Sequence, residues 1–105
     1  MTFRDVIDHI FFSERCAYEK NFYSLLEKEA GFVRIAKSCT TLEQLNAVQA
    51  WWIRILFEKE CQVCRGLDLK WALKTMDLYK NRRAYARAFI AGLKEKIEKN
   101  ESDIY

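Results

Sequence analysis

Cys61 and Cys64 are separated by two residues, which is the ligand spacing of half a zinc site. A complete site would need Cys16 and Cys39, or the single histidine His9, from separate segments that lack this spacing. A redox role is disfavoured because the pair lies near the expected end of a helix, where the helix dipole opposes a thiolate. We expect four reduced cysteines that pack as small apolar side chains, and no cofactor. A zinc-stabilised module is the alternative.

The chain carries few groups that could perform acid, base or nucleophilic catalysis. His9 has Asp5 four residues before it and Asp8 beside it, an arrangement typical of a solvated helix face. The sequence has no Gly-rich phosphate loop, no Gly-x-Ser-x-Gly elbow and no His-Glu-x-x-His metal motif. Glu27 and Glu29 stand two residues apart, so a helix would point them to different sides. We therefore predict no catalytic residues and a protein that is not an enzyme.

Basic side chains gather toward the C-terminal third of the chain. Residues 67–99 hold nine basic and four acidic side chains, whereas residues 1–66 hold nine of each. On a helix with 100° per residue, four of the basic residues fall within about 60° of one another and a fifth lies within reach of them. These five residues, called the basic stripe below, are Lys80, Arg82, Arg83, Arg87 and Lys94.

The basic stripe has three possible roles. It could contact nucleic-acid phosphates, with Tyr79 and Tyr85 near enough in sequence to stack on bases, or it could contact carboxylates of a protein partner. Alternatively, the five side chains cover the edge of the fold and pair with carboxylates of neighbouring helices. The candidate carboxylates are Glu27, Glu29, Glu58 and Glu60. A net charge of only +3 favours this third role over dedicated nucleic-acid binding.

Trp51 is a large aromatic residue on the polar side of an expected helix. It falls with Arg54 and Glu58, opposite the apolar stripe that carries Leu45 and Trp52. Full exposure would forgo roughly 2 kcal/mol of burial, so we expect another helix of the chain or a partner to cover this ring. Tryptophan is a favoured anchor residue at protein interfaces.

Trp71 and Phe89 raise the same question on the last helix, because both lie at the edge of its apolar arc. Two long helices that are apolar on more than one side would explain a homodimer or a hetero-complex. A homodimer is therefore one hypothesis for this chain.

The elements that must position these residues are helices. The chain has no proline and only three glycines among 105 residues, which leaves long segments without turn chemistry and predicts an all-α fold. Thr2 can cap a first helix, Thr41 with Gln44 three residues later forms a capping box, and Asp68 can cap the last helix. Gly66 is the expected hairpin between the last two helices.

These signals predict an elongated antiparallel bundle of three to four helices, two of them long and running from 41 to 66 and from 68 to about 100. We expect a break or kink near Ser13 and a helix end at Gly31. Residues 32–38 form either one or two separate helical turns or a simple continuation of the helix. Residues 1–105 form a single domain, with 101–105 a frayed tail. The predicted apolar stripe of the last helix is Leu69, Leu73, Met76, Tyr79, Ala86, Ile90, Leu93 and Ile97.

Composition also bears on location. Half of the residues are hydrophobic, yet no apolar run approaches the roughly 20 residues of a membrane span, and Arg4, Asp5 and Asp8 interrupt any secretory signal. We expect a cytoplasmic protein without membrane contact. In size and composition, though in no diagnostic residue, the chain is similar to small proline-free helical proteins of phages and mobile elements, which implies an accessory protein, inhibitor or regulator that acts by binding.

The leading hypothesis is therefore a non-enzymatic protein-protein interaction module. Trp51 would act as the aromatic anchor and the basic stripe would contact acidic groups of the partner. The rival hypothesis is a nucleic-acid-binding protein that uses the last helix, whose affinity would fall steeply with salt.

Overall fold

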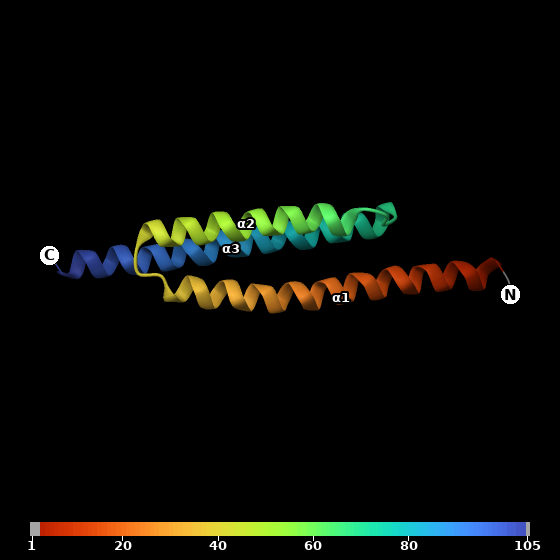
Figure 1. Ribbon diagram of the computed structural model, residues 1–105, viewed down its shortest axis with the longest axis horizontal. Helices are drawn as coiled ribbons and strands as arrows, with labels where there is room; N and C mark the ends of the chain where they lie inside the picture. The colour runs from red at the N-terminus through yellow and green to blue at the C-terminus, as the bar shows by residue number, and fades with distance from the viewer. Residues whose placement is uncertain (1–2, 105) are drawn as a thin grey trace.

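A computed structural model shows three helices that pack side by side in an elongated molecule with extents of 74 × 17 × 15 Å (Figure 1). It describes the backbone of residues 3–104 and the side chains of residues 15–100. The helices are α1 (Phe3–Ser38), α2 (Leu42–Cys64) and α3 (Leu69–Ile104). α2 and α3 form an antiparallel hairpin, and α1 lies along it in the same direction as α3 (Figure 1). The prediction of an all-α fold is confirmed.

Local sequence signals set the ends of α2 and the start of α3. The Thr41 side chain accepts a hydrogen bond from the Gln44 backbone amide at 3.1 Å, and the Gln44 side chain accepts one from the Thr41 amide at 3.3 Å. Asp68 accepts a hydrogen bond from the Trp71 amide at 3.2 Å. Gly66 has φ of 79°, which residues with a Cβ rarely adopt, and makes the hairpin turn. The predicted caps at Thr41 and Asp68 and the turn at Gly66 are confirmed.

α1 differs from the predicted first segments. It runs without interruption through Ser13 and Gly31 to Ser38, so the break near Ser13 and the helix end at Gly31 are wrong. Serine is tolerated inside a helix, and Gly31 lacks the positive φ that ends one. Phe32 and Ala36, both buried, continue the apolar side of α1 beyond Gly31 and hold the helix against the hairpin.

Near the C-terminus the structure differs from the sequence-based prediction, and the first and last residues lie outside the described part of the chain. α3 continues to Ile104, so the segment predicted as a frayed tail is helical through that residue. Thr2, the predicted first cap, and Tyr105 lie outside the described residues. α1 and α3 each have 36 residues and α2 has 23, so the segment that begins at Thr41 is the shortest of the three helices.

The core lies where the three helices meet. The Phe32 ring of α1 stacks on the Trp52 ring of α2, with centroids 5.3 Å apart and planes 8° apart, and meets Phe89 of α3 edge-on at 6.1 Å. Such offset aromatic pairs add roughly 0.5–1.5 kcal/mol to the burial of their area. The buried aliphatic residues around this stack are Leu25, Leu45, Leu56, Leu78 and Ile90.

The predicted apolar stripe of α3 is confirmed in its second half and wrong in its first. Tyr79, Ala86 and Ile90 are buried, but Leu69, Leu73 and Met76 are 74%, 51% and 47% exposed. Trp71, Thr75 and Leu78 are buried in their place, at spacings of four and three residues.

Two physical effects explain this choice of face. Trp71 has more apolar area to remove from water than any leucine. Burial does not leave the Thr75 hydroxyl without a hydrogen bond, because the hydroxyl donates one to the Trp71 carbonyl at 2.8 Å.

Matched leucine substitutions test this assignment of the core. Leu56→Ala removes a fully buried side chain at the α2–α3 contact and should lower the free energy of unfolding by about 2–5 kcal/mol. Leu73→Ala removes an exposed side chain and should cost less than about 1 kcal/mol. Urea unfolding followed by circular dichroism measures both values. Equal losses would show that the sequence-predicted stripe is the core after all.

Candidate partner-binding groove

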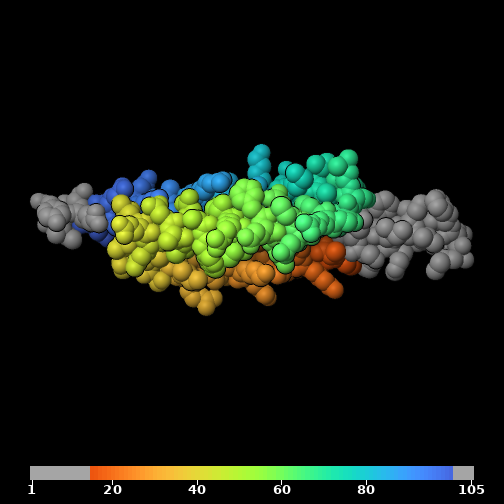
Figure 2. Space-filling view, turned by 45° about the horizontal axis from the view of Figure 1, so that its top comes forward, coloured from red at the N-terminus to blue at the C-terminus, as the bar shows by residue number. Residues whose placement is uncertain are grey.

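Trp51 lies at the boundary between α1 and α2, where the described part of the molecule has an open apolar groove. The space beside it has a volume of about 260 Å³ and continues into a second space of about 240 Å³. Trp51 of α2 and Ile35 of α1 line both spaces. In Figure 2 the atoms of α2 border those of α1 along most of the length of α2.

The shape of the groove follows from the residues that line it. Ala47 and Val48 of α2 and Gly31 of α1 are small, so the two helix surfaces leave room between them. A Cβ atom on Gly31 would meet nothing within 4 Å, which confirms open space above that residue. The rest of the first space is lined by Lys28, Phe32, Ile35, Trp51, Trp52 and Ile55.

Trp51 is partly covered by the chain itself. Its ring lies 6.1 Å from the buried Trp52 ring at an angle of 43°, and 39% of the residue is exposed. Ile35 across the groove is 46% exposed. Two large apolar residues thus stay accessible around a hollow that an apolar side chain of a partner could enter.

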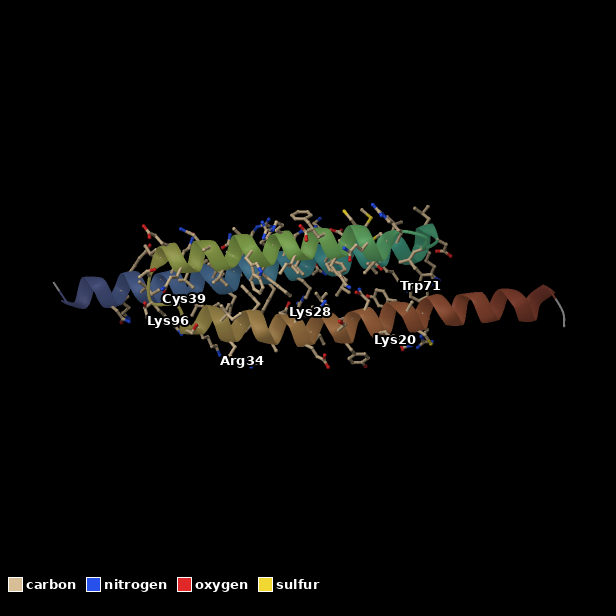
Figure 3. All side chains as sticks on the ribbon, viewed as in Figure 1. Lys20, Lys28, Arg34, Cys39, Trp71 and Lys96 are labelled. Atoms are coloured by element: carbon tan, nitrogen blue, oxygen red, sulfur yellow. The ribbon has the colours of Figure 1, made fainter. Side chains whose placement is uncertain are left out.

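One charged side chain, Lys28 of α1, lines the groove. Lys28 is exposed and lines the first space, and Figure 3 shows it on the side of α1 that faces the hairpin. Within residues 15–100, Lys28 forms no ion pair. A carboxylate of a bound partner could therefore pair with it at the edge of the apolar surface.

None of the stripe residues lines the Trp51 groove, and the two adjacent arginines of the stripe pair with different helices. Arg82 points to α1 and donates a hydrogen bond to Glu29 at 2.9 Å. Arg83 points to α2, donates to Glu60 at 2.6 Å, and its guanidinium lies 4.1 Å from the centre of the Phe57 ring. The expected pairing with glutamates of neighbouring helices is confirmed for these two arginines.

The remaining three residues of the stripe differ in their surroundings. Lys94 donates a hydrogen bond to the Asn46 side chain of α2. Lys80 and Arg87 are exposed and form no ion pair with any described side chain. On a helical wheel they share the outer side of α3 with exposed Leu69, Leu73 and Met76, so this side is basic in its middle and apolar toward the hairpin.

Sequence reasoning identified Trp51 but not the other wall of its groove. Ile35 lies in the part of α1 after Gly31, whose state the sequence left open, and Lys28 was not singled out among the basic residues. The available signal was the spacing of Phe22, Leu25, Phe32 and Ala36, which alternates in steps of three and four through Glu29 and predicts one continuous helix.

The cysteines do not form a metal centre among the described residues. No group of three or more His, Cys, Asp or Glu side chains in that part of the chain could hold a metal ion, and His9 falls outside the described side chains. Burial raises the pKa of the Cys64 thiol, and Glu60 and Cys61 raise it further. The thiolate form of Cys64 is therefore less accessible than that of an ordinary cysteine.

Comparison of the chain with protein-family models, with curated proteins and with solved structures finds no match. Within the described residues, none of the helices combines the length and the apolar character that crossing a membrane requires.

Two polar contacts join α1 to α3 beside the aromatic core. The Tyr79 hydroxyl donates a hydrogen bond to Asn21 at 3.0 Å, and Arg82 pairs with Glu29, which is only 7% exposed. Burial raises the pKa of Glu29 above its usual 4.5, and the nearby Arg82, which lowers it, offsets only part of this effect.

The raised pKa of Glu29 makes the free energy of unfolding depend on pH, and Glu29→Gln should remove this contribution. Because folded Glu29 holds its proton more tightly than unfolded Glu29, its contribution to stability is largest below pH 4.5 and is lost as the pH rises through the folded-state pKa. The stability of the native chain relative to Glu29→Gln should therefore increase as the pH falls from 7 to 4. Urea unfolding of both chains at several pH values measures this difference. A decrease would mean that Arg82 outweighs burial.

Proposed function

We propose that this chain is a non-enzymatic protein-protein interaction module that binds its partner in the groove between α1 and α2. The observation that carries the proposal is Trp51, which is 39% exposed in the wall of an open apolar groove rather than covered by another helix. Large aromatic residues at the edge of an apolar hollow supply much of the binding energy of protein interfaces.

The partner that fits this groove is a helix or extended segment with one apolar side chain for the hollow and a carboxylate beside it. The apolar side chain would fill the space between Ile35 and Trp51, and the carboxylate would pair with Lys28. Lys80 and Arg87, the exposed residues of the basic stripe, lie on α3 and would attract an acidic partner from a distance.

The intramolecular pairs of the stripe support protein binding over nucleic-acid binding. A row of phosphates would have to compete with Glu29 for Arg82 and with Glu60 for Arg83. Breaking such partly buried pairs leaves a carboxylate without its partner, which costs energy that phosphate binding must first offset. Of the five stripe residues, only Lys80 and Arg87 are exposed and without a hydrogen-bonded partner among the described side chains, so only these two could contact phosphates without this cost.

Affinity capture with matched variants tests the proposal. Tagged protein is incubated with host lysate after nuclease treatment, and the retained proteins are identified by mass spectrometry. Trp51→Ala should weaken binding of the retained protein about tenfold or more, because the anchor of the groove is lost. Phe57→Ala, which removes an aromatic residue that is similarly exposed outside the groove, should change it less than about threefold.

Three results would contradict this function. One is retention that disappears with nuclease, which would indicate nucleic-acid binding by α3. A second is equal loss of binding in the Trp51→Ala and Phe57→Ala variants. The third is a Trp51→Ala chain that no longer melts cooperatively, which would place Trp51 in the core.

A further inference from the structure

A second open cleft lies between α1 and α3. Its volume is about 430 Å³, and its lining residues are Arg15, Tyr18, Glu19, Lys70, Trp71 and Lys74. The Tyr18 and Trp71 rings form an aromatic contact there, with centroids 5.7 Å apart and planes tilted by 48°. Figure 3 shows Trp71 between α3 and α1, near the hairpin end of α3.

Positive charge exceeds negative charge in this cleft. The Lys74 ammonium lies 4.7 Å from the centre of the Trp71 ring, and the Lys70 ammonium lies 6.0 Å from it. The one carboxylate of the lining, Glu19, accepts a hydrogen bond from Arg15 at 3.1 Å. Neither lysine forms an ion pair with any side chain among residues 15–100. Among residues 15–100, these two cations thus face the same hollow without an ion pair.

The aromatic contact positions these cations instead of offering a stacking surface. Trp71 is only 9% exposed, Lys74 occupies one approach to its ring, and Tyr18 packs against it. A nucleobase would therefore have no free indole face on which to stack, although stacking supplies much of the affinity of single-stranded nucleic acid for proteins. The attraction between Lys74 and the ring restrains the lysine, which lowers the entropic cost of binding an anion.

We propose that this cleft binds an acidic segment of a protein, in which neighbouring Asp or Glu carboxylates pair with Lys70 and Lys74. Each pair would be a charge-assisted hydrogen bond. The lining residues of this cleft all differ from those of the Trp51 groove, so variants can test the two sites separately.

Hexaglutamate is a suitable probe, and isothermal titration calorimetry at low salt measures its affinity. The double variant Lys70→Gln/Lys74→Gln should lose about tenfold or more in affinity. The control, Lys96→Gln/Lys99→Gln, lowers the net charge by the same amount with two exposed lysines of α3, and should lose less than about twofold. Figure 3 shows Lys96 toward the other end of α3 from Trp71. Thermal melting checks that both variants stay folded, as expected for exposed side chains.

Several outcomes would overturn the proposal. Equal losses in the two double variants would show that hexaglutamate follows net charge rather than the cleft. No binding to the native chain at low salt would show that the cleft does not recognise carboxylates. Tighter binding of an oligonucleotide such as oligo(dT) with the same dependence on Lys70 and Lys74 would assign the cleft to phosphates instead.

Discussion

The contact of α1 with the α2–α3 hairpin is the interaction on which the surfaces of this molecule depend. Its centre is the Phe32 ring, which stacks on Trp52 of α2 and meets Phe89 of α3 edge-on. Polar contacts from Asn21 and Glu29 to α3 accompany it at two further positions along α1. Apolar contacts alone would tolerate a shift of α1 along the hairpin, whereas these donor and acceptor pairs match in one register only.

That register determines which residues face each other on either side of α1. On the α2 side it places Gly31 and Ile35 opposite Trp51 and leaves the apolar groove. On the α3 side it places Tyr18 against Trp71 and leaves the basic cleft. A shift of α1 by one helical turn, about 5.4 Å, would bring different residues of α1 opposite Trp51 and Trp71. The two binding proposals therefore rest on the same packing of α1.

The sequence predicted the fold where local signals decide it. The capping box at Thr41, the cap at Asp68 and the turn at Gly66 act within a few residues, and each has the predicted role in the structure. The prediction failed where a long-range contact outweighs a local signal. Glycine at position 31 predicts a helix end, but the helix continues because Phe32 and Ala36 are buried against the hairpin.

Prediction of the candidate site was also limited to what local patterns show, because the sequence does not reveal which helices pack against each other. Helical periodicity placed Trp51 off the core stripe of α2, and the structure leaves it partly exposed. Periodicity could not show that Arg82 and Arg83, adjacent in sequence, pair with glutamates of two different helices. It also treated Leu69, Leu73 and Met76 as core, because the choice between that side of α3 and the side of Trp71 depends on where α1 packs.

Filling the groove is the most direct test of the central claim that it binds the partner. Gly31→Leu adds a side chain into open space and replaces a helical glycine, so the fold should gain up to about 1 kcal/mol while the groove is blocked. Gly92→Leu is the matched control, since a Cβ atom there also meets nothing within 4 Å and Gly92 lies on α3. We predict that Gly31→Leu abolishes binding of the captured partner and that Gly92→Leu preserves it. Full binding by a folded Gly31→Leu chain would contradict the account.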